Sequence, residues 1–255
     1  MKNIITFILL LTPFYYVNAA APADSLQKLL EEGNALYSQD KYTEAISVYN
    51  KILGQGYESG ILYYNLGNAY YRLGKIGFSR LYYEKSLRFL KNSDDLKHNL
   101  QLLQLKLVDK IKEPPKFLLY QWRDNILNLF SMQFITWSLI ALFWLSILFA
   151  LLRLLLRKNY RIDFIGSFHK IILTIFVFSL FIFMQKVYFA ETEKFGVITM
   201  TSVTAYAEPD VHGTEVFVIH EGTKIKLERK NNNWYEIRLA DGKSGWIENK
   251  KLEII

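Results

Sequence analysis

The sequence predicts an α + β multidomain membrane protein with three parts: an α-helical solenoid, two transmembrane helices and a small C-terminal β-barrel. Three observations predict this fold class. A self-match with a period of 34 residues lies near the N-terminus, and two long apolar runs occupy the middle of the chain. Short alternating segments broken by turn residues then fill residues 195–255.

The composition limits the chemistry that the chain can perform. The hydrophobic fraction of 51% and the aromatic fraction of 16% are high for a soluble protein, and the apolar residues pool in a few segments. The absence of cysteine excludes disulfides, thiol nucleophiles and thiolate metal sites. Much of the net charge of +7 lies beside the apolar runs, so membrane topology explains it better than nucleic-acid binding does.

Residues 1–21 are typical of a secretory signal peptide. Lys2 supplies the positive start, and residues 4–17 form an apolar stretch too short for a comfortable membrane span. Small residues at Ala19 and Ala21 offer cleavage sites. An uncleaved anchor is the alternative, and cleavage is favoured.

Residues 22–113 carry the repeat. The paired positions are Gly33/Gly67, Asn34/Asn68, Ala35/Ala69, Tyr37/Tyr71, Ala45/Ser79, Tyr49/Tyr83 and Leu53/Leu87. This register marks two stacked helical hairpins of the tetratricopeptide (TPR) type. The glycines allow close approach of the two helices of each hairpin, and the tyrosines fill the gap to the next hairpin. A closing helix is expected from Ser93 to Lys112, because the last repeat of a solenoid exposes an apolar face.

Residues 114–133 form a juxtamembrane amphipathic segment. Pro114 and Pro115 end the helical array, and apolar residues then alternate with Lys116, Arg123 and Asp124. The pattern fits a helix on the membrane surface leading into the first span. It fits equally well an ordinary helix packed on the end of the repeats.

Two spans are predicted at residues 134–152 and 171–189. The first contains no charged residue and, at about 1.5 Å per residue, covers close to the roughly 30 Å of a bilayer core. Lys186 lies near the exit of the second span, where snorkelling is favoured over a function inside the bilayer.

The loop at residues 153–170 sets the predicted orientation. Its charged residues are Arg153, Arg157, Lys158, Arg161, Asp163 and Lys170. By the positive-inside rule this basic loop is cytoplasmic. Both terminal domains then face away from the cytoplasm, which agrees with a signal peptide.

The C-terminal segment, residues 195–255, has the rhythm of a small all-β domain. The expected strands are 197–200, 203–206, 216–219, 224–228, 234–239, 245–247 and 252–254. Turn residues separate them at 208–210, 212–213, 221–222, 231–233 and 241–242. Short strands in so small a domain favour a closed barrel, which leaves no exposed edge.

The residue order in this segment resembles that of bacterial SH3-like domains. Asp241-Gly242 followed by Gly245-Trp246 is a fairly specific part of the resemblance. The resemblance implies that Tyr206, Trp234 and Trp246 belong to the core or to a ligand groove. A packing role is favoured for both tryptophans, because buried aromatics dominate small cores.

No constellation for catalysis is apparent. The four histidines show no metal-ligand spacing, and no phosphate-binding glycine loop or Gly-x-Ser-x-Gly motif occurs. We therefore expect no enzyme activity, no cofactor, no metal and no nucleic-acid partner.

The candidate site is the concave face of the repeats. In TPR domains that clamp peptide C-termini, asparagines grip the ligand backbone and a lysine holds its carboxylate. By this resemblance Asn34 and Asn65 match the asparagine positions, with Asn68 and Asn99 as neighbours in register, whereas Leu30 occupies the lysine position. Peptide-backbone contact without C-terminal specificity is expected; the alternative is asparagines that are solvated or cap local backbone.

The order of modules resembles the TPR/SH3 protein of bacterial aerotolerance operons, the BatE-like family. The resemblance implies a non-enzymatic scaffold of the inner membrane, with both domains periplasmic, in an envelope-stress complex with von Willebrand A-domain partners. The lipid bilayer is then a further partner. Two alternatives remain: a peptidoglycan-binding protein that recruits a wall enzyme, and a weaker one, a sensor acting through the spans.

Overall fold

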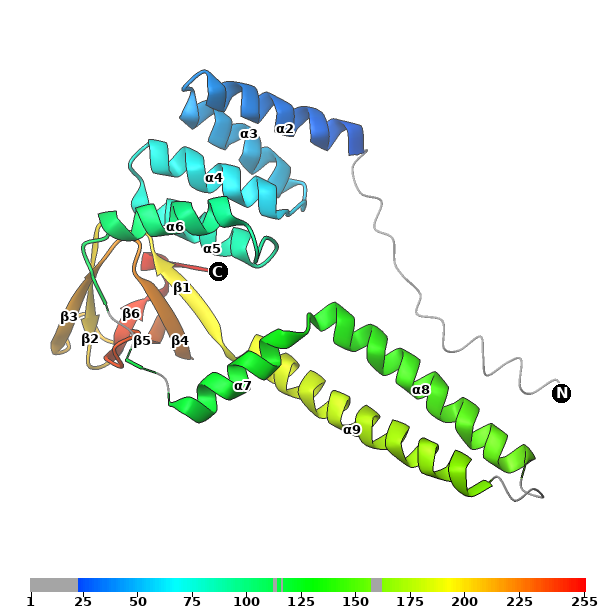
Figure 1. The fold of residues 1–255 in the computed structure, drawn as a ribbon. Coiled ribbons are helices and arrows are strands. Elements are labelled where there is room, and N and C mark those ends of the chain that lie inside the picture. The colour runs from blue at the N-terminus through cyan, green and yellow to red at the C-terminus, as the bar shows by residue number, and fades with distance from the viewer. Residues whose placement is uncertain (1–22, 112–113, 116, 157–161) are drawn as a thin grey trace. The chain divides into compact units, whose positions relative to one another are not determined.

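The computed structural model describes residues 23–111, 114–115, 117–156 and 162–255 (Figure 1). They belong to two compact units, of which the first ends at Leu107 and the second begins at Val108. The predicted signal peptide lies outside the described residues.

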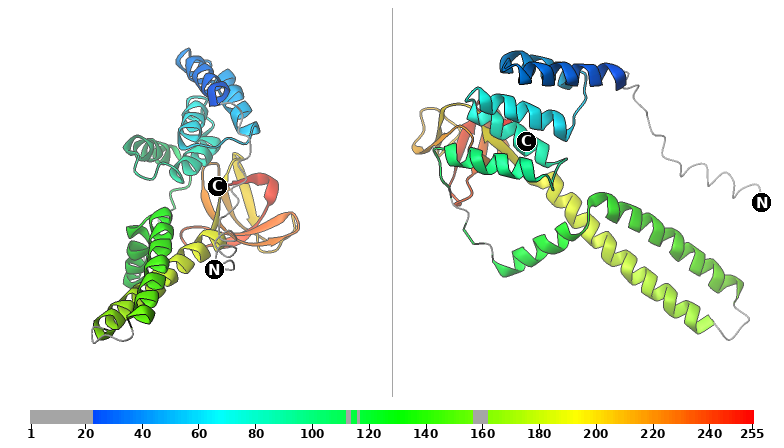
Figure 2. Two further views of the ribbon diagram at one scale, coloured as in Figure 1. Left: turned by 90° about the vertical axis from the view of Figure 1, so that its right-hand side faces the viewer. Right: turned by 45° about the horizontal axis from the view of Figure 1, so that its top comes forward.

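The first unit is a series of helical hairpins. Its helices are α2 (Ala23–Ser38), α3 (Tyr42–Gly54), α4 (Gly60–Arg72), α5 (Ile76–Leu87) and α6 (Asp94–Lys106). The helices lie side by side in chain order, as two views show (Figure 2). Two hairpins and a closing helix were predicted and are present, but the closing helix ends at Lys106 instead of Lys112.

The repeated glycines lie beneath the repeated tyrosines. A Cβ atom on Gly33 would lie 2.4 Å from the Tyr49 ring, and one on Gly67 would lie 2.4 Å from the Tyr83 ring. Each tyrosine therefore packs on the glycine of its own hairpin. Each also belongs to a core cluster with leucines of the helix that follows, as the sequence predicts.

Caps and turns repeat along the unit as well. Ser59 and Ser93 begin α4 and α6, and each side-chain oxygen accepts a hydrogen bond from a backbone N–H in the first turn. Asp40 (φ 62°) and Gly74 (φ 72°) both adopt the left-handed conformation between the two helices of a hairpin. Asp40 and Gly74 are 34 residues apart, so the backbone conformation repeats with the same period as the sequence.

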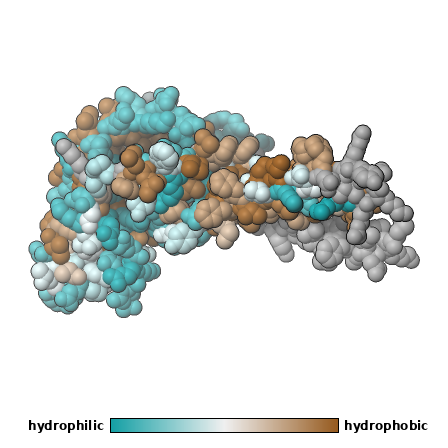
Figure 3. Space-filling view, turned by 60° about the horizontal axis from the view of Figure 1, so that its bottom comes forward, coloured by the Kyte–Doolittle hydropathy of each residue, from teal (hydrophilic) through white to brown (hydrophobic). Residues whose placement is uncertain are grey.

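The helices of the second unit are α7 (Leu118–Leu129), α8 (Met132–Leu155) and α9 (Ile162–Thr192). Both α8 and α9 are long and apolar enough to span a membrane, and few of their residues are buried. Apolar side chains gather on the molecular surface formed by these helices (Figure 3).

The two long helices exceed their predicted bounds. Arg153 and Lys170, expected in the loop at 153–170, lie on α8 and α9 respectively. His169, expected at the edge of that loop, lies inside α9, where its Nε2 atom is 3.1 Å from Ser146 Oγ on α8. The extent of an uncharged apolar run misses these ends, because a helix can continue through charged residues such as Arg153 and Lys170.

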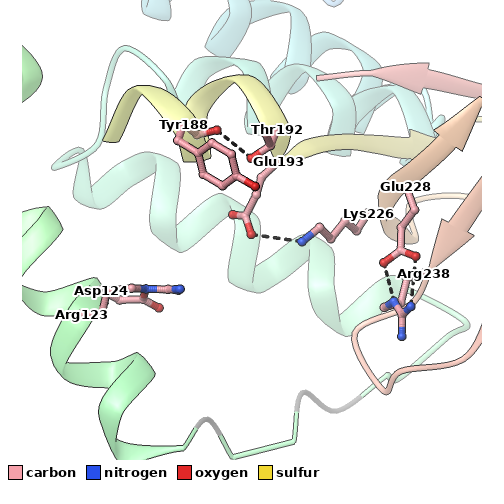
Figure 4. Close-up of polar contacts among 8 residues, drawn as sticks. All are labelled: Arg123, Asp124, Tyr188, Thr192, Glu193, Lys226, Glu228 and Arg238. Atoms are coloured by element: carbon pink, nitrogen blue, oxygen red, sulfur yellow. Dashed lines mark hydrogen bonds and ion pairs between the residues drawn. The ribbon is translucent and has the colours of Figure 1, made fainter. Parts of the chain in front are cut away.

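Helix α9 leads almost directly into the sheet. The first strand begins at Lys194, two residues after the helix ends. Glu193, the residue between them, forms an ion pair of 3.1 Å with Lys226 in the sheet (Figure 4).

Seven antiparallel strands form one sheet. They are β1 (Lys194–Ile198), β2 (Ser202–Tyr206), β3 (Glu215–His220), β4 (Lys224–Asn231), β5 (Trp234–Arg238), β6 (Ser244–Glu248) and β7 (Leu252–Ile254). Each coincides with a predicted strand to within a few residues. Left-handed residues Gly222, Asn232 and Gly242 lie at three of the predicted turns.

The prediction of a closed barrel is wrong. The strand order is β3-β2-β6-β5-β4-β1-β7, so β3 and β7 are edges that do not pair with each other. The core lies on one face of this open sheet; its largest buried members are Ile198, Ile219, Ile225, Ile237 and Ile247.

The carboxylate of Asp109, rather than a neighbouring strand, covers one end of the β3 edge. Asp109 accepts hydrogen bonds from the His220 backbone N–H (2.6 Å) and from the Thr223 hydroxyl (2.7 Å), and its other oxygen is 2.9 Å from His220 Nδ1. Burial opposes ionisation, but these bonds outweigh it and lower the pKa of Asp109. A charged group on an unpaired amide is one way of protecting an edge strand.

Candidate functional site

The predicted asparagines form two hydrogen-bonded pairs on the first unit. Asn34 on α2 uses its carbonyl oxygen to accept from Asn65 Nδ2 on α4, at 2.8 Å. The same oxygen accepts from the Tyr49 hydroxyl at 2.8 Å. The asparagine pair is therefore hydrogen-bonded to Tyr49, the tyrosine that packs over Gly33.

The second pair repeats this arrangement one hairpin later. Asn68 Oδ1 accepts from Asn99 Nδ2 at 3.0 Å and from the Tyr83 hydroxyl at 2.7 Å. Asn99 Nδ2 also donates to the Tyr64 hydroxyl at 3.0 Å. All four predicted asparagines thus lie on one series of helices, α2, α4 and α6.

Buried phenols hold these pairs in place. Tyr49 is 1% exposed and Tyr83 is 2% exposed. Burial raises the pKa of Tyr49 to about 12 and raises that of Tyr83 as well. Both phenols therefore remain protonated donors at neutral pH.

The arrangement fixes the amides and leaves part of their bonding capacity unused. Among the described residues, the hydrogen bonds of Asn34 and Asn68 use the carbonyl oxygen. An asparagine also carries two N–H donors, which suit the carbonyl groups of an extended peptide. The alternative of asparagines that cap local backbone does not describe these pairs, since their partners lie on neighbouring helices.

Two cations accompany the asparagines, and the sequence reasoning missed them. Arg72 Nε donates to the Tyr37 hydroxyl at 3.5 Å, a long hydrogen bond between α4 and α2. Lys106 Nζ lies 4.1 Å from the centre of the Tyr71 ring, between α6 and α4. The two cations are 34 residues apart, as are the two tyrosines, so the repeat register itself was the available signal.

Helical spacing places these groups on one face. Tyr71 and Arg72 follow Asn68 by three and four residues, which is one turn of α4. We call this surface the repeat face; it consists of Asn34, Tyr37, Asn65, Asn68, Tyr71, Arg72, Asn99 and Lys106. Leu30, at the expected lysine position, packs against the first core cluster.

The predicted aromatic residues of the sheet also lie together. Tyr206 on β2 and Trp234 on β5 make an edge-to-face contact with ring centres 5.9 Å apart. Trp246 on β6 is the register partner of Tyr206. All three are half-buried, and no tryptophan belongs to the core cluster, because the core residues Ile237 and Ile247 point to the other face. The packing role favoured for both tryptophans stays a prediction: they lie outside the buried core cluster, and Trp234 packs against Tyr206.

Other polar groups offer no evident reaction centre. Within the described residues, no cluster of three or more His, Asp or Glu side chains could hold a metal ion. His169 and His220 are engaged with Ser146 and Asp109 respectively.

Comparison with known proteins adds one similarity. No family model matches the chain, and no curated protein does. Among solved structures, the crystal structure of the Sgt2 TPR domain from Aspergillus fumigatus is similar, with 21% sequence identity over 39% of this chain and 91% of that one, at a TM-score of 0.24.

The TPR-like character of the first unit rests on its own hairpins and their 34-residue register. A TPR-like fold is typically a non-catalytic interaction module. The chain therefore combines TPR-like helical repeats with two helices that could span a membrane.

Proposed function

We propose that the protein is a non-enzymatic membrane adaptor whose repeat face binds an extended segment of another protein. The observation that carries the proposal is the repeat face itself. Two fixed asparagine pairs present amide donors at regular spacing, and a cation–tyrosine pair accompanies each. Such a surface can pair with peptide carbonyl groups and with acidic side chains of a partner.

One feature supports a membrane location and a second bears on the topology. Helices α8 and α9 have the length and polarity of spans, and a basic loop joins them. In addition, Asp109 precedes α8 and touches His220, which follows α9. If α8 and α9 both cross a bilayer, this contact requires the residues before α8 and after α9 to lie on the same side of it. The basic loop then faces the cytoplasm, and both ends face the other side.

The module order supports a more specific setting. Repeats, a two-span hairpin and a β domain whose residue order resembles SH3-like domains occur together in the BatE-like proteins of aerotolerance operons. By that resemblance the adaptor resides in the bacterial inner membrane, displays its domains in the periplasm and works with von Willebrand A-domain proteins in an envelope-stress complex.

A pull-down from detergent-solubilised membranes tests the adaptor. The variants are Asn34→Ala with Asn65→Ala, which removes an asparagine pair, and Arg72→Gln with Lys106→Gln, which removes the cations. Lys97→Gln is the matched control, because Lys97 is an exposed cation on α6 that pairs with Asp94. We expect both double variants to lose partners that the control retains; equal recovery by all three would refute a role for the repeat face.

A second candidate function is peptidoglycan binding through the sheet. It is favoured by the half-exposed Tyr206, Trp234 and Trp246, since aromatic rings on a surface stack against apolar faces of ligands. Co-sedimentation of the detergent-solubilised protein with purified cell wall tests it, with Trp246→Ala as the variant. Absence of co-sedimentation by the unaltered protein removes this candidate.

A further inference from the structure

Helix α7 carries a continuous apolar face that nothing in the described structure covers. Its five members are Leu118, Leu119, Trp122, Ile126 and Leu129, and each is 51–70% exposed. At about 100° per residue they fall within one arc of roughly 100° on the helix. None belongs to a buried core cluster of the described residues.

Helix α7 is attached to α9 by contacts that do not involve the side chains of this apolar face. The ammonium of Lys186 on α9 donates to the carbonyl oxygen of Phe130, at 2.8 Å, and to that of Leu127. These carbonyls lie at the C-terminal end of α7, where intrahelical partners run out and the helix dipole is negative. Lys186 therefore caps the C-terminal end of α7, which gives this lysine near the end of the apolar part of α9 a structural partner.

A second contact orients α7 along α9. The guanidinium of Arg123 lies 4.5 Å from the centre of the Phe189 ring. Figure 4 shows Arg123 and Asp124 together on α7. Phe189 lies nearer to the end of α9 than Lys186 does, by three residues or about 4.5 Å of helix. The C-terminal end of α7 is therefore its deeper end, if α9 crosses a bilayer.

A break in the helical backbone separates α7 from α8, but the exposed apolar surfaces of the two helices adjoin. Phe130 and Ser131 both have extended backbone angles, and the Ser131 hydroxyl oxygen accepts from Phe134 N–H to begin a new helix. The rings of Phe130 and Phe134 stack with centres 5.1 Å apart. The apolar face of α7 thus passes into the exposed apolar surface of a candidate span.

We infer that α7 lies in the interfacial layer of the bilayer, with its apolar face toward the acyl chains and its C-terminal end anchored by Lys186. The inference rests on the proposed membrane crossing of α8 and α9. Lipid is the occupant that the structure favours. The apolar face of α7 continues the exposed apolar surface of α8, which is one candidate span, and α7 is anchored to the C-terminal end of α9, which is the other. Trp122 is a residue type enriched at this depth.

Site-directed spin labelling of the full chain in phosphatidylcholine vesicles tests the inference. The chain has no cysteine, so single cysteines can be introduced without removing any. Labels replace Trp122 and Leu129 on the apolar face, Gln121 on the polar side, and Phe143 on α8. Collision with oxygen, which partitions into lipid, is compared with collision with a water-soluble nickel chelate.

We expect oxygen to dominate at Trp122 and Leu129, with Leu129 deeper, and nickel to dominate at Gln121. Nickel access at Trp122 and Leu129 equal to that at Gln121, with Phe143 still in lipid, overturns the inference and leaves the span intact. Shielding of both labels from both reagents also overturns it, because a protein would then cover the face. Nickel access at Phe143 removes the membrane crossing itself.

The anchor is tested by Lys186→Met in the Leu129-labelled protein. We expect nickel access at Leu129 to rise to the level of Gln121, because the end of α7 is released. Lys186→Arg keeps a donor and should preserve the depth, and Lys194→Met, at an exposed lysine beyond α9, is the matched control. Unchanged depth in Lys186→Met refutes the anchoring role.

Discussion

Replacement of Gly67 by alanine should loosen the second hairpin by displacing a buried tyrosine. The new Cβ atom would lie 2.4 Å from Tyr83 Cδ1 and 2.6 Å from Cε1, whereas ordinary contacts begin near 3.4 Å. The ring cannot easily move aside, because Tyr83 is 2% exposed and its hydroxyl is bonded to Asn68. Either α4 and α5 separate, or the ring shifts and that hydrogen bond breaks.

The expected cost follows from these two contributions. Overpacking of a well-filled core costs about 1 to 3 kcal/mol, and a lost hydrogen bond costs about 1 kcal/mol more. Gly54→Ala is the matched control: it lies at the end of α3, and a Cβ atom there would meet nothing within 4 Å. Both changes gain the helix propensity of alanine, so their difference, about 2 to 4 kcal/mol, isolates the clash.

Hydrogen–deuterium exchange of the full chain in detergent measures this difference locally. A loss of 2 to 4 kcal/mol corresponds to exchange roughly 30- to 700-fold faster for the protected amides of α4 and α5. Protection within a few-fold of that in the Gly54→Ala protein would show that the Tyr83 ring tolerates a methyl group at position 67, and would refute the expected clash.

Three further changes test other contacts. Tyr83→Phe keeps the ring but removes the donor to Asn68, so α4 and α5 should lose about 1 kcal/mol by the same exchange measurement; unaltered protection would contradict the pairing. Asp109→Asn should destabilise the sheet at neutral pH by about 1 to 3 kcal/mol in chemical unfolding followed by tryptophan fluorescence. The pKa of Asp109 is lowered in the folded protein, so its carboxylate stabilises the fold at pH values above the ordinary pKa of about 3.9. This stabilisation is lost as the pH falls below that value, and the Asp109→Asn variant should lack the acid-dependent loss. Glu228→Gln breaks an exposed ion pair with Arg238, and a change above about 1 kcal/mol would contradict the small value expected for such pairs.

Local patterns were enough to predict the elements of the sheet. Alternation of side chains marks each strand, and Gly222, Asn232 and Gly242 adopt the left-handed angles that their residue types favour. Closure of the sheet is different, since it depends on hydrogen bonds between β3 and β7, the two ends of the strand order. No local pattern reports whether such distant strands meet.

The repeat face was predictable only in part. The register placed the four asparagines near one another, and the structure brings them into two pairs. Their tyrosine partners were also recognised, but as packing residues. Both Asn34–Tyr49 and Asn68–Tyr83 are separated by 15 residues, a regularity that the sequence contains and that points to the hydrogen bonds. Cation–ring contacts such as Lys106 on Tyr71 depend on rotamers, which periodicity does not report.

The bond between Asp109 and His220 also has a consequence for biosynthesis. Its two residues are 111 positions apart, and both long apolar helices lie between them. A ribosome delivers Asp109 first, so its carboxylate cannot reach these donors until α8, α9 and the end of β3 have been synthesised. The contact therefore joins one of the first residues of this unit to a strand made after both long helices, and a product cut short before His220 would leave that carboxylate without these donors.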